Sequence, residues 1–306
     1  MSTTKLPHCA ALARQLGELP IGTASRIGSV LLIEHAGTWP VDVRERVLTE
    51  CFGPGAPERM DRLHVGLGLR ALIIRKPGRN RAPDRPTVYV GGCRPGQRWL
   101  ERFQIDSYRD LADLDPVRIA TGTGGFGEPV TGPLLLVCTH GRKDACCAML
   151  GRPVADTLGA LYPEQTWQCT HFGGDRWAGN LLVAPHGFMY GQLTPATALP
   201  VAELAGAGRI SLANLRGRVG TDPFAQVAEI AVRERTGLTG LDEVLALGPR
   251  EIGEDRAEVE VNTVLGGAYR VLVRRFPLGV QGHSVCSGEA RPHRFEVLDV
   301  QTALPV

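Results

Sequence analysis

The chain has 306 residues, of which 43% are hydrophobic and 22% are charged, so it can bury a sizeable core in about two domains. The net charge of +2 at pH 7 is too small to favour a nucleic acid or an anionic membrane as partner. Eight cysteines in a chain of this length exclude a disulfide-dense secreted scaffold. Any cluster among these cysteines therefore indicates metal binding or thiol chemistry.

The first 20 residues contain charged side chains and no continuous apolar run, which argues against a signal peptide. No stretch of the sequence reaches the roughly 18 apolar residues of a transmembrane helix. We therefore expect a cytoplasmic protein without a membrane partner.

Residues 1–130 are predicted to form an N-terminal α/β region. Apolar runs indicate strands at Ser29–Glu34, Ala71–Ile74 and Thr87–Val90, and a helix is expected from about Val41 to Cys51. Strands that alternate with helices are typical of an α/β layer architecture.

Two segments of this region are predicted to be loops. The charged, Pro- and Gly-containing stretch Arg75–Arg81 is expected to be a solvated loop. The glycine-rich run Ile119–Glu128 is interpreted as a flexible connection. It lacks the G-x-G-x-x-G spacing between a strand and a helix that a phosphate-binding loop requires.

The central region, residues 131–208, begins with Pro133–Cys138, an apolar run suited to a buried strand. Asp144 can then cap a helix through its carboxylate. One face of that helix is predicted to be buried, because apolar residues recur at spacings of three and four, and Pro153 is expected to kink or split it. The recurring apolar positions are Cys147, Leu150, Val154, Leu158 and Leu161.

A second strand is expected at Thr166–Thr170, followed by a hairpin of Asn180–Ala184 with Phe188–Gln192 and a closing helix at Pro195–Ala205. The order strand, helix, strand, loop, hairpin, helix is that of a thioredoxin-like domain. The predicted fold class is therefore α/β with a thioredoxin-like core.

Residues 209–306 are predicted to form a C-terminal α+β region. Its helix begins after the cap Asp222 and ends at Gly237. A hairpin then joins Glu258–Val264 to Ala268–Phe276. A three-residue turn would pair Val261 with Val271 and Val259 with Val273, and would set Glu258 opposite Arg274.

Soft metal ligands gather at one edge of the predicted central sheet. Cys138 ends the first strand, and Cys147 lies in the first turn of the helix, where the helix dipole favours a thiolate. Cys169 and His171 follow the second strand, so the ends of both strands meet at this edge. Thiolates and an imidazole suit a transition metal or an iron–sulfur cluster. The chain has no C-x2-C pair of the zinc or thioredoxin type, and a Cys or His at a strand end is often purely structural.

Two segments, CTHGRKDACC (138–147) and HFGGDRWAGN (171–180), resemble those of the sucrase/ferredoxin-like family, and the segments 22–39 and 215–237 resemble its bacterial members. The resemblance implies a thioredoxin-like ferredoxin domain that carries a [2Fe–2S] cluster held by two cysteines and two histidines. By position, Cys138 and Cys147 would hold one iron and His171 would be the first histidine. The second histidine position is occupied by Asp175.

This departure leaves the fourth ligand open. Asp175 would ligate through oxygen, Cys169 or Cys286 would replace it, or the fold would be retained without a cluster. The sucrase part of the family name implies no activity, because no pair of acidic residues lies in a recognisable glycosidase motif.

The function implied by the resemblance is one-electron transfer with a redox partner protein, as an electron carrier or a component of an oxidoreductase. Arg142, Lys143 and Arg176 flank the motifs and would stabilise a reduced cluster, and Trp177 would cover it or belong to the core. Two alternatives remain. One is a thioredoxin-like thiol protein that uses Cys146 or Cys147, and the other is a zinc-stabilised binding module.

Overall fold

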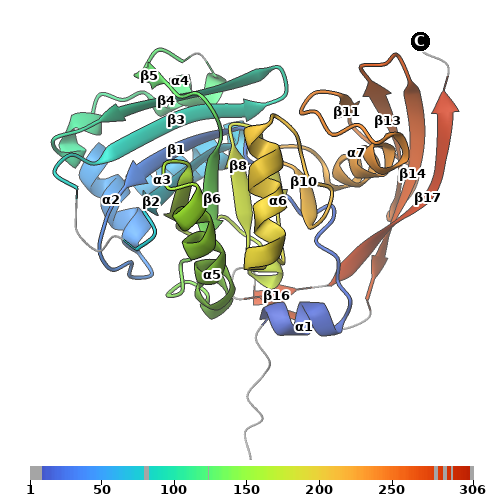
Figure 1. The fold of residues 1–306 in the computed structure, drawn as a ribbon, viewed down its shortest axis with the longest axis horizontal. Coiled ribbons are helices and arrows are strands. Elements are labelled where there is room, and N and C mark those ends of the chain that lie inside the picture. Colours follow the sequence, from blue (N-terminus) through green and yellow to red (C-terminus); the bar gives the residue numbers. More distant parts are fainter. Residues whose placement is uncertain are drawn as a thin grey trace, which may run out of the picture.

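The computed structural model describes residues 9–78, 83–122, 124–278, 282–284, 288–290 and 292–303. Within them, ten strands form one mixed sheet and five form a second sheet, with a short two-stranded ribbon beside them (Figure 1). The predicted α/β class is confirmed. Among the described helices, none has the length and apolar character needed to cross a bilayer.

The first half of the large sheet is built from residues 29–129. Its strands are β1 (Ser29–Glu34), β2 (Leu69–Arg75), β3 (Thr87–Arg94), β4 (Gln97–Gln104) and β5 (Glu128–Pro129). Its helices are α2 (Val43–Phe52), α3 (Ala56–Leu67), the 3-10 helix η1 (Tyr108–Leu111) and α4 (Pro116–Thr121). A short helix, α1 (Cys9–Gln15), precedes this half.

The second half contains the predicted central module. Its strands are β6 (Leu134–Cys138), β7 (Thr166–Cys169), β8 (Leu181–Ala184), β9 (Phe188–Tyr190) and β10 (Leu215–Arg218). Its helices are α5 (Ala145–Leu161), the 3-10 helix η2 (Asp175–Trp177) and α6 (Pro195–Gly206). Strand, helix, strand, hairpin and helix occur in the predicted order.

The two halves repeat one topology. The first has the strand order β2-β1-β3-β4, with β1 and β2 parallel and the other pairs antiparallel. The second has the order β7-β6-β8-β9 with the same directions. Strands β2 and β7 join the halves through the antiparallel pairs Ile74–Cys169 and Arg75–Gln168. The halves meet in the sequence between Pro129 and Leu134, and both lie in one sheet.

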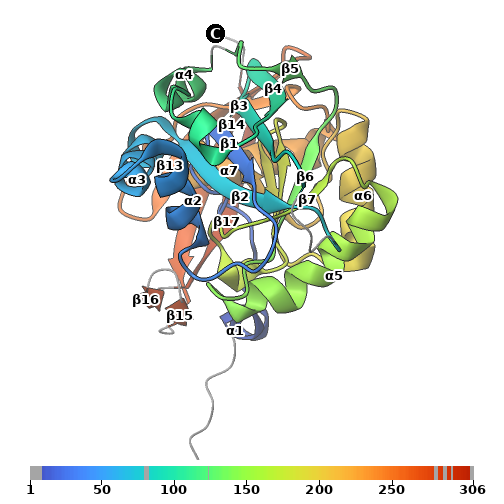
Figure 2. The same cartoon turned by 90° about the vertical axis from the view of Figure 1, so that its left-hand side faces the viewer.

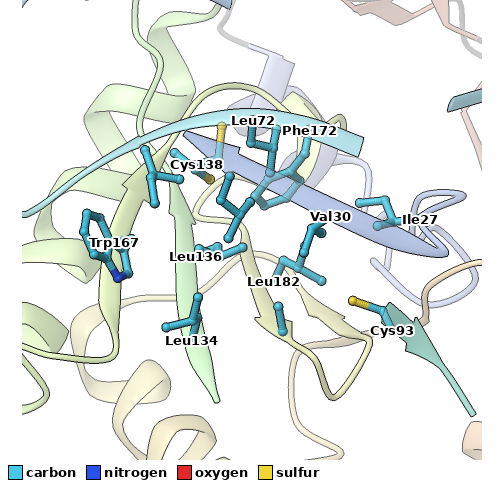
Figure 3. Packing of buried hydrophobic residues seen from close by; sticks show 14 of the residues in the cluster. Ile27, Val30, Leu72, Cys93, Leu134, Leu136, Cys138, Trp167, Phe172 and Leu182 are labelled. Atoms are coloured by element: carbon cyan, nitrogen blue, oxygen red, sulfur yellow. The ribbon is translucent and has the colours of Figure 1, made fainter. Parts of the chain in front are cut away.

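A core shared by the two halves lies on the inner face of the curled sheet. Successive strand residues alternate between faces, so Leu134, Leu136 and Cys138 point inward to meet Val30 and Leu72 from the first half. Figure 3 shows Cys138 beside Leu72 and Phe172, at the end of this core away from Cys93. Helices α2 and α3 cover the outer face of the first half and α5 and α6 that of the second (Figure 2).

The C-terminal unit packs α7 (Pro223–Thr236) on a second sheet. As predicted, the Asp222 carboxylate caps α7 and Gly237 ends it. The strands of this unit are β11 (Val244–Ala246), β12 (Arg250–Glu251), β13 (Arg256–Thr263), β14 (Ala268–Pro277) and β17 (His293–Ala303), and the short ribbon is formed by β15 (Gly282–Ser284) and β16 (Gly288–Ala290).

The predicted register of the β13–β14 hairpin is wrong. Val259 pairs with Val271 and Val261 pairs with Tyr269, so the strands are displaced by two residues from the expected register. Glu258 lies opposite Leu272 instead of Arg274. The connection still has three residues, but they are 264–266 and not 265–267, because Thr263 closes it by donating its backbone N–H to the Gly267 carbonyl and accepting the Gly267 N–H on its Oγ1. Moving the turn by one residue displaces the pairing by two. A shift of two residues keeps the same faces buried, so hydrophobic alternation could not detect it.

Three loop and helix predictions also need correction. The glycine-rich segment is not a free connection, because the Glu101 carboxylate on β4 accepts the backbone N–H groups of residues 125–127, and β5 then joins the sheet. Pro153 lies inside one continuous helix, so α5 is not split. Arg75 belongs to β2, and its side chain is half-buried instead of solvated.

Candidate metal centre

Three soft donor atoms converge at the carboxyl edge of β6 and β7. The Nδ1 atom of His171 lies 3.5 Å from the Sγ of Cys147 and 3.8 Å from the Sγ of Cys138. All three donors lie within 4.8 Å of one another. Both cysteines are buried and His171 is half-buried. The structure therefore brings together three of the four residues that the sequence singled out.

The local sequence explains this convergence. Cys138 is the last residue of β6, and the Oδ1 of Asp144 caps α5 by accepting the backbone N–H of Cys146 at 2.7 Å, which fixes Cys147 in the first turn. His171 follows β7, which runs parallel to β6 and pairs Cys169 with Cys138. Parallel strands end at the same edge of a sheet, so the three donors meet there.

The two thiols share a hydrogen bond that makes them unequal. Donation from Cys147 lowers the pKa of Cys138 well below its ordinary value, and hydrogen bonds from His171 and from the backbone N–H of His140 act in the same direction against the effect of burial. The same hydrogen bond, together with burial, raises the pKa of Cys147. Cys138 is therefore the first of the two thiols to become a thiolate.

Two arginines border the centre, Arg70 half-buried and Arg216 buried. Arg70 lies on the inner face of β2 and donates from Nη2 to the backbone carbonyl of His171 at 2.8 Å. Arg216 on β10 donates to the Oδ1 of Asn180 at 2.9 Å and also bonds Thr23. Burial lowers the pKa of Arg70 to about 10 and that of Arg216 to about 9, whereas the charge of Cys138 opposes both shifts. These cations compensate the negative charge of the thiolates.

The fourth ligand predicted at Asp175 stays open. Asp175 is buried at the start of η2, and its charge influences both Cys147 and Arg216, but its carboxylate lies outside the group of three converging donors. Cys169 is also outside that group, and burial raises its pKa. Cys286 lies outside the described residues.

The other residues that flank the motifs have different surroundings. Arg176 forms a buried ion pair with Glu18, so its charge is already balanced. Arg142 and Lys143 are exposed. Trp177 packs against the guanidinium of Arg216, whose central carbon lies 5.1 Å from the ring centroid. Trp177 therefore covers an arginine that borders the centre.

A second group of possible ligands lies on the neighbouring face of α5. The Sγ atoms of Cys9 and Cys146 are 3.5 Å apart, and the Oδ2 of Asp144 lies 3.7 Å from the Sγ of Cys9. All three side chains are buried. The group links α1 to the start of α5, one residue before Cys147.

The donor set of the main centre fits a thiophilic metal. Two thiols and an imidazole are ligands for zinc and for iron–sulfur clusters. The distances of 3.5 and 3.8 Å from the Nδ1 of His171 to the two sulfurs match the distance between two ligand atoms of a single tetrahedral ion. His171 lies in a loop beside Gly173 and Gly174, both of which adopt positive φ.

Sequence reasoning missed Arg70, Arg216 and Cys9 as neighbours of the centre. A signal for Arg70 was present, because it interrupts the apolar run of β2. Arg216 lies in β10, a short strand with two arginines that are both buried, and charged side chains are rarely buried without a partner. Cys9 carried no such signal, since it lies far from the motif in sequence and is brought to Cys146 only by tertiary packing.

Comparison with known proteins agrees with this architecture. The family model described as sucrase/ferredoxin-like matches residues 20–217, which include both halves of the large sheet up to β10. No curated protein and no solved structure matches the chain. The matched segment covers more than half of the sequence and contains Cys138, Cys147 and His171. The chain therefore belongs to the sucrase/ferredoxin-like family.

Proposed function

We propose that the protein transfers single electrons through a [2Fe–2S] cluster held by Cys138, Cys147 and His171, with Asp175 or Cys169 as the fourth ligand. The observation that carries the proposal is the convergence of two buried thiols and an imidazole at one sheet edge. A cluster bound there would accept and release one electron at a time.

The residues around the centre suit this role. Arg70 and Arg216 place two positive charges beside Cys138 and would favour the more negative, reduced state of the centre. The backbone N–H of His140 donates to the Cys138 sulfur, a contact that also tunes a bound metal. His171 is the most accessible donor, so it marks the face on which a redox partner protein would dock.

The decisive measurement is the ultraviolet–visible spectrum of the protein purified without oxygen, with iron and acid-labile sulfide counted on the same sample. We expect visible absorption together with about two irons and two sulfides per chain. A colourless protein that contains one zinc ion at this site would instead establish the zinc-stabilised binding module. A protein without any metal would contradict both metal proposals.

A thiol function is the second candidate, and the Cys9–Cys146 pair is the observation that favours it. These sulfurs lie 3.5 Å apart, so a small movement brings them to the roughly 2.05 Å of a disulfide. Hydrogen bonding from Cys9 lowers the pKa of Cys146, which makes Cys146 the attacking thiolate. Exchange with a small-molecule disulfide would form the Cys9–Cys146 bond and release two molecules of the reduced thiol.

Mass spectrometry tests the thiol candidate directly. After treatment with glutathione disulfide and alkylation, we expect Cys9 and Cys146 to be protected together as one intramolecular disulfide. The variant Cys9→Ser should instead retain glutathione on Cys146, because no resolving thiol remains. Alkylation of both thiols in the treated wild-type protein would rule out the pair as a redox device.

A further inference from the structure

A basic cavity lies beside the metal centre. It has a volume of about 890 Å³ and is bounded by segments that follow β1, β2 and β6 and by the first turns of α5. Its lining includes Trp39, Arg75, His140, Arg142, Arg152 and Gln168. The cavity therefore opens at the carboxyl edge of parallel strands from both halves of the sheet, the position where α/β proteins bind small ligands.

All the described charged side chains that line this cavity are positive. Arg75, Lys76, Arg142 and Arg152 line it, and no aspartate or glutamate occurs among the described residues of its wall. By contrast, the cavity of about 590 Å³ near β3 and β4 mixes arginines with Glu34 and Glu164. Cations that converge without carboxylates repel one another, so the basic cavity gains stability when an anion enters.

The arginines are positioned to bind such an anion. The Nε of Arg75 donates to the Oε1 of Gln168 at 2.9 Å, and its guanidinium lies 4.2 Å from the ring centroid of Trp39, so the group is already held in place. Burial lowers the pKa of Arg75, and the charge of Arg152 lowers it further. Arg142 and Arg152 are exposed and form no ion pair with any residue that the structure describes.

We propose that this cavity binds a small phosphate-bearing anion next to the metal centre. Planar guanidinium groups bind phosphate oxygens through paired hydrogen bonds, and the cavity volume lies in the range of sites for small molecules. The wall formed by residues 139–142 directly follows Cys138. His140 belongs to that wall, and its backbone N–H donates to the Cys138 sulfur, so a ligand here contacts the segment that holds the metal.

Isothermal titration calorimetry with pyrophosphate at low ionic strength tests the proposal on the full-length protein. We expect saturable binding to the wild-type chain that weakens as sodium chloride is added. The double variant Arg142→Gln/Arg152→Gln should bind at least about tenfold more weakly, because two charge-assisted contacts are lost. Both side chains are exposed, so the fold should persist.

A charge-matched control separates the cavity from a general effect of net charge. The variant Arg62→Gln/Arg109→Gln also removes two exposed cations, and neither residue lines the cavity. We expect it to bind pyrophosphate as the wild-type protein does. Equal weakening in both double variants, or no pyrophosphate binding by the wild-type chain, would overturn the proposal. The readout is heat of binding, so the result does not depend on whether the metal centre is an iron–sulfur cluster.

Discussion

Replacing Cys138 by serine is expected to abolish visible absorption between about 300 and 600 nm and to remove iron and sulfide from the purified protein. Cys138 is the thiol with the lowered pKa, and its sulfur accepts hydrogen bonds from Cys147, His171 and the backbone of His140. A serine hydroxyl cannot be deprotonated at this position near neutral pH, so it cannot replace the thiolate as a ligand. Absorption spectra with iron and sulfide analysis check the result.

The matched control for this substitution is Cys93→Ser. Cys93 on β3 belongs to the same shared core and is fully buried, but it lies at the opposite end of that core (Figure 3). Both variants replace a buried thiol of the shared core by a hydroxyl, at a cost of about 1–3 kcal/mol in unfolding free energy. Only Cys138→Ser should lose the metal. Unchanged colour in Cys138→Ser, or equal loss of iron in both variants, would refute the ligand assignment.

The elements that the sequence predicted best are those with local signals. The helix α7 begins after Asp222 and ends at Gly237, where capping depends on neighbouring residues only. The hairpin of β8 and β9 follows from two apolar runs on either side of a Pro- and Gly-containing turn. Cys138 and Cys147 were placed correctly because a strand end and a capped helix start are both visible in ten residues of sequence.

The features that escaped prediction depend on contacts between distant segments. The junction of β2 with β7 pairs residues almost one hundred positions apart, and it lies beside the contact of Arg70 with the carbonyl of His171. The repeat of one topology in both halves is likewise hidden, because the halves share strand order and direction without shared motifs. The position of Asp175 outside the converging donors depends on the course of the loop after β7, which no periodic pattern specifies.

The close approach of α5 to β6 leads to a second large expected effect. Gly151 lies in α5 directly against the backbone of Cys138, and a Cβ at this position would lie far inside contact distance of the Cys138 carbonyl oxygen. The carbonyl belongs to a central strand and cannot move aside, so Gly151→Ala must push α5 outward. We expect the variant to lose its metal and about 1–3 kcal/mol of unfolding free energy, because the helix carries Cys147 away from Cys138.

Iron analysis and urea denaturation of Gly151→Ala, compared with Gly206→Ala, test this coupling. Gly206 is the last residue of α6, and an added methyl group there would meet nothing within 4 Å. Alanine is a better helix former than glycine by up to about 1 kcal/mol, so Gly206→Ala should be neutral or stabilising and should keep its metal. If Gly151→Ala is destabilised but keeps its iron, the spacing between α5 and β6 does not control the ligand geometry. If Gly151→Ala loses iron in proportion to the lost stability, the close packing of α5 on β6 that glycine permits is what allows Cys138 and Cys147 to bind the same metal.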